Sequence, residues 1–543
     1  MTTSDSTLGR RVLAIMGGTA ATALVLAGCA SGGGDAADDA LDGISVGTTD
    51  VITSLDPAGS YDNGSFAVQN QVFGFLTNSP YGSPDVEPDL AATAEFTDPT
   101  TYTVTLKDGL TFANGNALTS SDVKFTFDRQ LAIADPNGPS SLLANLDSTD
   151  APDDTTVVFH LKGADQTWPQ ILSSPAGPIV DEDVFSATAV TKPADIVSGD
   201  AFSGQYSITD YKENEAIQYE ANDSYDGVLG APKASSITAT YYTKETDLKL
   251  AVQEGDVDVA NRSLSPTDLA DLAKDDSLTV HNGPGGEIRY MVFNLNTQPF
   301  GATQPDADPA KALAVRQAVA DSVDRAALAK DVYNDTYTPL YSVVPDGLTG
   351  ATEPLKSLYG DGEGGADVAK ATAALSAAGV STPVEIDLQY SPDHYGASSD
   401  EEYALIKTQL EATGLFTVDL QSTLWDTYST ERREDAYPVY QLGWFPDFSD
   451  ADNYLSPFFV KDNFVGNHYD DAEVQGLLTQ EIAESDETAR TAIIGQIQDA
   501  VAADLPTLPL LQGTQVVVSA KDVKGVDDTL DASFKFRYGA LSR

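Results

Sequence analysis

The sequence is poor in the residues that build disulfides and metal cages. It has one cysteine and four histidines among its 543 residues. A single cysteine excludes an intramolecular disulfide. The histidines are far apart in the chain, which argues against a transition-metal site made by side chains alone, although a metal that arrives already chelated is not excluded. We therefore predict no cofactor and no protein-made metal site.

Basic residues are also scarce. The chain has 30 Lys and Arg against 83 Asp and Glu, a formal net charge of −53, and the acids are spread along the chain instead of gathered in one tail. Such a surface repels nucleic acid and anionic lipid, so we exclude both as partners of the folded body. A hydrophobic content of 41% with 28 Pro and 43 Gly indicates a globular protein, and the length allows several domains.

We also expect no active site of a common exported hydrolase. No His-Glu-x-x-His motif occurs, and we expect no nucleophile elbow. Paired acids are so frequent in this chain that a carboxylate pair of the glycosidase kind is not excluded by counting. We favour a binding protein that is not an enzyme, with a secreted hydrolase as the alternative.

Long apolar runs are confined to the N-terminus. Arg10 and Arg11 precede an apolar run from Val12 to Leu26, which has the order of an export signal and is too short to span a membrane as a mature helix. The run leads into Leu-Ala-Gly-Cys29, which resembles the lipobox of bacterial lipoproteins, where cleavage precedes the cysteine and the cysteine carries the lipid. We predict a signal peptide at residues 1–28 and a flexible acidic tether at 29–42, with Cys29 anchoring the protein to the outer face of the cytoplasmic membrane.

The rest of the chain alternates between strand and helix patterns, which indicates mixed α/β lobes. A helix is predicted for Ala67 to Leu76 and a strand for Leu110 to Phe112. Thr119 to Asp122 has the spacing of a capping box that opens a helix. Asp308 is expected to cap another helix, whose first turn holds a proline.

The stretch Thr103 to Arg129 joins several local signals: a strand, a Lys-Asp-Gly turn, an Asn-Gly turn and the capping box. In this order they resemble the signature of the family 5 extracellular solute-binding proteins of ABC importers, a group that includes oligopeptide, dipeptide and nickel binders. Further matches follow in the family's order, at Glu254 to Val259, Met291 to Asn294, Val315 to Arg325 and Leu505 to Val518. Turn and cap chemistry explains Thr103 to Arg129, so we assign it a structural role.

This resemblance implies an α/β, two-lobed periplasmic-binding-protein-like fold of type II, in the large class with an extra subdomain in the first lobe and the ligand in the cleft between the lobes. We expect the first lobe at residues 43–285 with the subdomain at about 90–190, the second lobe at 286–503, and a return to the first lobe at 504–543. The crossovers would lie near His281 to Met291 and near Ala503 to Leu511, where Gly or Pro provide hinges.

One stretch combines aromatic rings with carboxylates. Gly443 to Phe459, GWFPDFSDADNYLSPFF, places three Asp among six aromatics, so it does not fit an ordinary apolar strand. A positively charged ligand group suits such a wall, because it can pair with a carboxylate and lie against the rings. The alternative is a surface loop whose aromatics reach back into the core while its Asp residues face water. Asp450 and Asp452 are expected to be capping or solvated groups.

The beginning of this stretch resembles the Gly-Trp-x-x-Asp segment that lines the cleft of the peptide-binding relatives, where the backbone pairs with the peptide and the Asp takes its free amine. The resemblance implies that Asp447 binds the ligand's ammonium group. It also implies backbone contacts from Gly443 and Phe445, and a place in the site for Trp444. Pro446 has no amide hydrogen, so one possible backbone bond is absent.

Other candidate site residues lie upstream. Trp425 matches a tryptophan that lines the pocket of oligopeptide binders, although a tryptophan in a strand-rich lobe is as often a core residue. Arg432 or its neighbour Arg433 could receive a peptide carboxylate as a bidentate partner, and the alternative is a surface arginine. Relatives contribute a wall of the first lobe at the loop that corresponds to Tyr61 to Asn63, so we include Tyr61 and Asn63.

These observations favour a lipid-anchored, monomeric receptor that captures short peptides between two lobes and delivers them to the permease and ATPase subunits of an ABC importer. Relatives of the fold also carry oligosaccharides and metal chelates, and an oligosaccharide would use the aromatics as stacking platforms. A signalling or adhesive lipoprotein without a transporter is a further alternative.

Overall fold

The computed structural model describes residues 43–543 except residues 263, 397 and 534. The predicted signal peptide, Cys29 and the predicted tether lie outside the described residues. In the part of the chain that the structure describes, no helix is long and apolar enough to cross a membrane.

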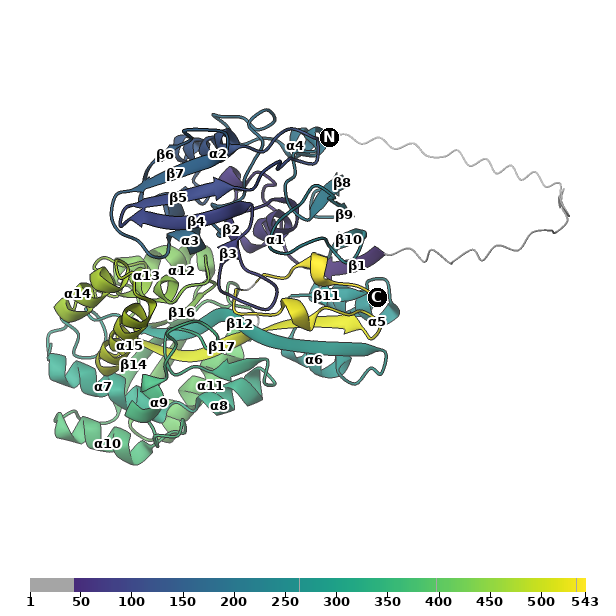
Figure 1. Cartoon of the computed structure of the whole chain (residues 1–543). Coiled ribbons are helices and arrows are strands. Elements are labelled where there is room, and N and C mark those ends of the chain that lie inside the picture. Colours follow the sequence, from purple (N-terminus) through teal and green to yellow (C-terminus); the bar gives the residue numbers. More distant parts are fainter. Residues whose placement is uncertain (1–42, 263, 397, 534) are drawn as a thin grey trace, which may run out of the picture. The chain divides into compact units, whose positions relative to one another are not determined.

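Eleven strands of the described chain form one sheet, with a pair of long antiparallel strands at its centre (Figure 1). The order is β15 (Phe416–Ser422), β14 (Val384–Tyr390), β16 (Val439–Trp444), β12 (Leu278–Phe293), β17 (Thr507–Ala520), β11 (Val259–Asn261), β1 (Gly43–Thr48), β10 (Ser236–Tyr241), β9 (Ala216–Ala221) and β8 (Tyr206–Lys212), with β13 (Tyr337–Pro339) also beside β17. The long strands β12 and β17 pair with each other, and β16 joins one side of this pair while β11 joins the other. They therefore connect two groups of strands that would otherwise be separate.

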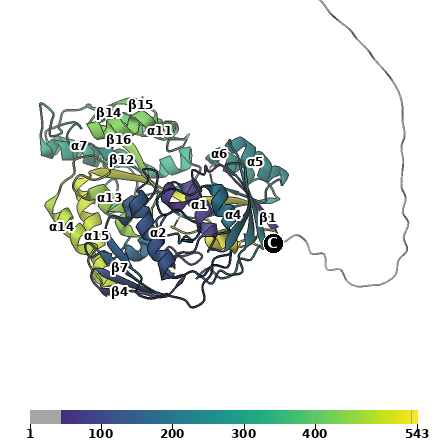
Figure 2. The same cartoon turned by 90° about the horizontal axis from the view of Figure 1, so that it is seen from above.

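The helices also fall into two groups (Figures 1 and 2). The first group of helices is α1 (Asn63–Val72), α4 (Pro193–Gly199), α5 (Glu245–Glu254) and α6 (Pro266–Leu272). The second is α7 (Pro309–Ser322), α8 (Arg325–Ala327), α9 (Pro354–Leu358), α10 (Val368–Ala377), α11 (Ser399–Ala412), α12 (Trp425–Glu431), α13 (Ser456–Phe459), α14 (Ala472–Glu481) and α15 (Glu487–Asp504). The apolar clusters around β1 and β8 to β11 are distinct from those around β14 to β16, as expected for two lobes.

A separate antiparallel sheet of four strands lies early in the described chain, in the region where an inserted subdomain is predicted. Its order is β4 (Ala91–Asp98), β5 (Thr101–Leu106), β7 (Thr156–Leu161) and β6 (Leu146–Asp150). Together with α2 (Ser120–Ile133) and α3 (Trp168–Ile171) it encloses its own apolar core. A short pair, β2 (Thr77–Asn78) and β3 (Glu87–Pro88), precedes it.

The long strand β12 is irregular where a hinge is expected. Its register with β17 shifts between Pro284 and Ile288, a stretch that contains Gly286. A Cβ atom on Gly286 would lie 2.6 Å from Cγ of Pro446, so the glycine allows β12 to pass close to the predicted ligand-binding stretch. The Tyr454 hydroxyl also donates to the carbonyl oxygen of Gly286 at 2.6 Å. The predicted hinge region and the predicted site are therefore in direct contact.

Capping chemistry sets several helix boundaries. The predicted capping box at Thr119 is present, and Asp308 caps α7 by accepting from two backbone N–H groups. The helix predicted for Ala67 to Leu76 is displaced: α1 begins at Asn63 because the Asp62 side chain accepts from the N–H of Ser65, and it ends at Val72. The strand predicted for Leu110 to Phe112 is reduced to an isolated bridge at Thr111.

The first strand contains a serine pattern shared with hydrolase elbows, Gly-x-Ser-x-Gly, at Gly43 to Gly47. Here the pattern lies inside β1, which pairs with β10 and β11. The Ser45 hydroxyl donates to Asp258 at 2.8 Å. An elbow requires an exposed serine on a sharp turn between a strand and a helix, so this pattern does not form one.

Candidate ligand-binding site

Asp447 lies three residues beyond the end of β16 and is half-buried. Its Oδ1 accepts a hydrogen bond from the hydroxyl of Tyr61, and its Oδ2 accepts one from Nδ2 of Asn453 at 3.2 Å. Burial raises the pKa of Asp447, and these two hydrogen bonds oppose the rise. Among the described residues, no Lys, Arg or His side chain forms an ion pair with Asp447. The carboxylate is therefore desolvated without a compensating positive charge.

Asn453 connects Asp447 to Trp444. Its Oδ1 accepts from the backbone N–H of Asp447 at 3.0 Å and from Nε1 of Trp444 at 2.9 Å. The Trp444 ring packs edge-on against Phe458 and Phe464, with centroid distances of 5.4 and 5.2 Å. The predicted site residue Trp444 thus holds the Asp447 segment in place, and Asn453 is a positioning residue that the sequence analysis missed.

Tyr61 reaches Asp447 from the loop that precedes α1. The loop ends at Asp62, whose side chain caps α1 and also accepts from the hydroxyl of Thr53. The side chain of Asn63, the first residue of α1, is half-buried and makes no hydrogen bond with the described residues. The structure therefore brings Tyr61 and Asp447 together, whereas Asn63 has no polar contact with Asp447.

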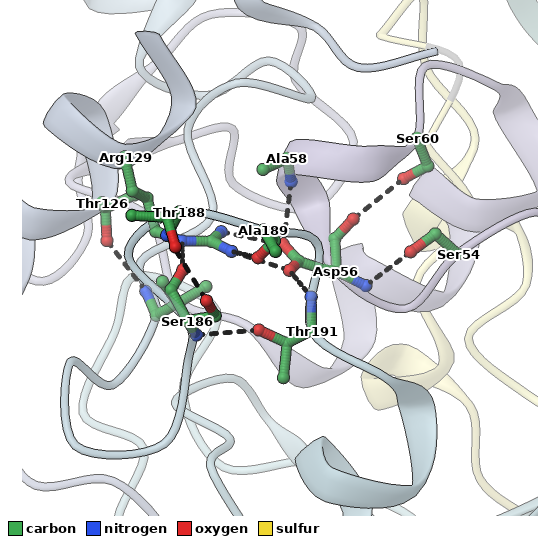
Figure 3. Close-up of polar contacts among 11 residues, drawn as sticks. Ser54, Asp56, Ala58, Ser60, Thr126, Arg129, Ser186, Thr188, Ala189 and Thr191 are labelled. Carbon is green, nitrogen blue, oxygen red and sulfur yellow. Dashed lines mark hydrogen bonds and ion pairs between the residues drawn. The ribbon is translucent and has the colours of Figure 1, made fainter. Parts of the chain in front are cut away.

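A buried ion pair fixes the other end of this loop (Figure 3). Nη1 and Nη2 of Arg129 donate to the two carboxylate oxygens of Asp56, each at 2.8 Å, and both side chains are almost fully buried. Asp56 also accepts from the N–H of Ala58 at 3.0 Å and from that of Thr191 at 2.6 Å. This charge-assisted network holds the turn five residues before Tyr61. Arg129 is the last residue of the stretch Thr103 to Arg129, to which we assign a structural role from its sequence.

A cavity of about 350 Å³ is lined by the two long strands, by residues of α5 and α6, and by β13 and loop residues from the part of the chain that carries the second group of helices; we call it the crossover cavity. Its lining consists of Glu245, Arg262, Leu264, Ser265, Pro266, Leu269, Glu287, Arg289, Tyr333, Thr336, Tyr337, His394, Tyr395, Gly396, Ser398, Phe445, Thr514, Gln515 and Val516. Phe445 is two residues from Asp447, so the cavity and the Asp447 carboxylate belong to one neighbourhood. Among the predicted residues, Phe445 lines the cavity directly.

Gly443 and Trp425 each lie against a residue that lines the crossover cavity. A Cβ atom on Gly443 would lie 2.8 Å from the ring of Tyr395, so a glycine is required for the strand to approach this ring. The Trp425 ring stacks on His394 with a centroid distance of 3.6 Å and an interplanar angle of 3°. Burial lowers the pKa of His394 to about 4, so His394 is neutral near pH 7. Trp425 therefore positions a lining residue and is not itself part of the lining.

The comparison with known proteins identifies the family. The sequence profile of the bacterial extracellular solute-binding proteins, family 5, middle region, matches residues 85–466, which is more than half of the chain. The chain belongs to this family. A probable D,D-dipeptide-binding periplasmic protein of Escherichia coli K12, DdpA, is 25% identical over 484 residues, which cover 87% of this chain and 89% of the relative. Heme-binding protein A of Haemophilus influenzae is 26% identical over 489 residues, 84% of this chain and 85% of the relative.

A solved structure supports the fold. The unliganded open form of the periplasmic murein tripeptide binding protein MppA has a TM-score of 0.76 at 20% identity, and the match covers 92% of this chain and 97% of that one. The predicted two-lobed α/β fold is thus confirmed. Family 5 proteins are exported binding proteins of ABC importers, so this family 5 protein is not an enzyme.

The arginines predicted near the site lie elsewhere in this family 5 protein. Arg432 is fully buried, and its Nη1 donates to the backbone carbonyl oxygens of Phe464 and Val465, both at 3.0 Å. Arg433 is exposed, with its guanidinium 5.7 Å from the centroid of the Phe464 ring. Neither lines the crossover cavity. These positions do not favour the predicted contact with a ligand carboxylate, and Arg289, which does line the cavity, was missed.

The prediction that Asp450 and Asp452 are capping or solvated groups is only partly correct. Asp450 caps a short 3₁₀ turn, Ala451–Tyr454, but it is buried and forms two hydrogen bonds with Arg490, at 2.7 and 2.8 Å. Asp452 is buried beside the carboxyl group of Glu481. Nε of Arg490 donates to Glu481 at 3.0 Å. Within the described residues, no group of three or more His, Cys, Asp or Glu could hold a metal ion.

This acidic cluster predicts a pH dependence of stability. Burial first and the charge of Asp452 second raise the pKa of Glu481 from 4.5 to about 9. The folded protein therefore keeps a proton that the unfolded chain releases. Below about pH 4.5 this proton makes its full contribution to the unfolding free energy, and the contribution is lost as the pH rises toward about 9. At pH 7, between these limits, we expect Glu481→Gln to gain more than about 1.4 kcal/mol in unfolding free energy relative to wild type, the equivalent of one pKa unit. Urea unfolding at a series of pH values measures this difference.

Glu473→Gln is the matched control for this experiment, because Glu473 lies on the same helix, α14, and is exposed. The unfolding free energy of this variant should change with pH in the same way as that of the wild type, since an exposed carboxylate has nearly the same surroundings in the folded and unfolded states. A Glu481→Gln curve that also runs parallel to wild type would rule out a retained proton at Glu481.

Proposed function

We propose that this family 5 protein captures short peptides with a free amino terminus and presents them to the permease of an ABC importer. The observation that carries the proposal is Asp447, a desolvated carboxylate that has no cationic partner among the described residues and lies beside an aromatic-lined cavity. A ligand ammonium group would supply the missing charge through charge-assisted hydrogen bonds at low local dielectric. Two similar proteins are named for binding a D,D-dipeptide and a murein tripeptide, and both ligands belong to this class.

Closure of the lobes would couple binding to delivery. Tyr61 and Asp447 come from segments 386 residues apart in the sequence, which the predicted boundaries assign to different lobes. A ligand held between such segments stabilises the closed arrangement in proportion to its preference for that state, and a permease can recognise this arrangement. We keep the proposed boundaries: first lobe 43–285 with the insertion at about 90–190, second lobe 286–503, and the return at 504–543.

The place of action follows from the N-terminal sequence. We propose that residues 1–28 are removed, that Cys29 carries lipid, and that residues 29–42 tether a monomeric body to the outer face of the cytoplasmic membrane. ABC permease and ATPase subunits would be the protein partners. Mass spectrometry of the membrane-associated protein tests this part, because a lipid-modified Cys29 at the new N-terminus has a defined mass.

A ligand panel tests the proposed cargo. Thermal unfolding of the body is followed with dipeptides to hexapeptides, their N-acetylated forms, oligosaccharides, metal chelates and heme. A ligand present at about 100 times its dissociation constant stabilises a binding protein by roughly 2.7 kcal/mol. We expect this stabilisation from peptides with a free amine. Stabilisation by sugars, chelates or heme alone would leave the family assignment unchanged and would contradict the proposal that the ligand is a peptide.

A further inference from the structure

The four strands β4 to β7 with α2 and α3, which we call the four-stranded unit, lie beside α13 and α14 in both views (Figures 1 and 2). The backbone N–H of Gln166, two residues before α3, donates to the carbonyl oxygen of Ile482, the residue after α14, at 2.8 Å. Phe448, the residue after Asp447, packs against the apolar core of the four-stranded unit. The four-stranded unit therefore contacts the second group of helices at the end of α14 and at Phe448; we call these two contacts the clasp.

Buried charged groups fix the four-stranded unit to the side of α1. Arg129 of α2 forms the ion pair with Asp56, in the turn that leads to α1. Nζ of Lys535 donates to the carbonyl oxygen and the hydroxyl of Ser173, just beyond α3, at 2.8 and 2.9 Å, and Lys535 is buried. The same Nζ lies 5.8 Å from the ring centroid of Phe66 on α1. Hydrogen bonds of buried charged groups are strong, so the four-stranded unit is expected to move with α1 as one body.

The other side of the clasp is connected to the ligand-binding stretch. Glu481, the residue before Ile482, accepts from Nε of Arg490 at 3.0 Å. Arg490 also forms the two hydrogen bonds with Asp450, whose side chain caps the 3₁₀ turn that follows Asp447. The end of α14 and the segment that holds Asp447 are therefore expected to move together.

We propose that the four-stranded unit holds the cleft closed, because it contacts the second group of helices through Gln166 and Phe448 only while the two lobes are together. The two sides of the clasp belong to bodies that the long strands β12 and β17 connect, so opening about these strands would separate them. A contact present in one arrangement alone shifts the equilibrium toward that arrangement by its own free energy. This inference goes beyond the proposed function, since it assigns a role to the four-stranded unit whichever ligand the cleft receives.

The local turn allows the hydrogen bond of the clasp to be removed with little disturbance. Asp165 to Trp168 form a β-turn, in which the N–H of Trp168 donates to the carbonyl oxygen of Asp165 at 3.3 Å. Thr167 has φ −84° and ψ −5°, as expected at the third position of a type I turn. Gln166 is then at the second position, which proline favours, and proline lacks the N–H that bonds Ile482. Gln166→Pro therefore deletes this donor, whereas Gln166→Ala keeps it and is the matched control.

Spin labels on the two sides of the clasp measure closure. In the full chain Cys29→Ser leaves no native cysteine, so labels are placed at Leu131→Cys in α2 and Gln480→Cys in α14, both exposed positions. Double electron–electron resonance then gives the ratio of closed to open molecules, for each protein alone and with excess trialanine. Loss of one hydrogen bond should lower this ratio roughly 2- to 12-fold in Gln166→Pro, and Gln166→Ala should keep the wild-type ratio.

Phe448→Ala is a second variant that removes the apolar contact and leaves the turn at Gln166 intact. It should lower the ratio at least about 5-fold, and it decides the matter if Gln166→Pro does not fold. Wild-type ratios in both Gln166→Pro and Phe448→Ala, or an equal loss in Gln166→Pro and Gln166→Ala, overturn this inference. If the ratio falls as expected but trialanine closes none of the proteins, the inference stands and the result counts against the proposed function.

Discussion

Asp447→Asn is expected to abolish most of the preference for peptides with a free amino terminus. The change keeps the size of the side chain, and the amide can still accept from Asn453 and donate to the Tyr61 hydroxyl oxygen, but it removes the charge that an ammonium group would pair with. Truncating one partner of a buried charged pair costs about 2 to 5 kcal/mol, which is roughly a 30-fold to several-thousand-fold loss of affinity. Calorimetry with a tripeptide and its N-acetylated form should therefore give a large loss for the free amine and a small one for the acetylated peptide.

The stability of this variant provides a second readout. Burial raises the pKa of Asp447, so near neutral pH its charged form is less favourable in the folded protein than in the unfolded chain. Asn removes this cost, and the variant should be at least as stable as wild type. Asp426→Asn is a matched control, because Asp426 is an exposed acid at the start of α12. Equal weakening of both peptide forms in Asp447→Asn would exclude Asp447 as the amine partner.

Local chemistry explains what the sequence analysis predicted well. The capping box at Thr119 and the cap at Asp308 depend on residues a few positions apart, so both are visible in the sequence. The stretch Gly443 to Phe459 stands out because its carboxylates alternate with aromatics, which a plain core strand would not tolerate. The boundaries of α1 were wrong because apolar spacing outweighed the capping signal at Asp62.

The residues that were missed or misjudged depend on contacts across long sequence distances. Arg432 is fully buried, and its Nη1 donates to the carbonyl oxygens of Phe464 and Val465, more than thirty positions away. Arg289 looks like a polar interruption of a strand until the pairing of β12 with β16 places it opposite Gly443. Asn453 carries no sequence signal beyond its place in the aromatic stretch. Only the tertiary structure determines which polar groups find partners.

Arg129→Met is expected to lower the unfolding free energy by about 3 to 5 kcal/mol. The substitution leaves the Asp56 carboxylate buried, with backbone N–H groups as its remaining partners, and an uncompensated buried charge is strongly destabilising. Urea unfolding followed by circular dichroism measures this loss. Lys124→Met, on the same helix α2, removes a half-exposed ion pair with Asp128 and should cost less than about 1 kcal/mol.

The double variant Asp56→Leu with Arg129→Met separates the charge pair from the packing around it. If the loss in Arg129→Met comes from the unpaired carboxylate, removing that carboxylate should restore part of the stability, because replacing both members of a buried ion pair with apolar residues is often nearly neutral. A double variant that is less stable than either single variant would contradict this account. Since Asp56 lies in the turn that leads to Tyr61, the double variant should also show whether the loop needs the ion pair to keep the Tyr61 hydroxyl on Asp447. Recovered stability with weakened peptide binding would assign the pair a positioning role in the ligand site.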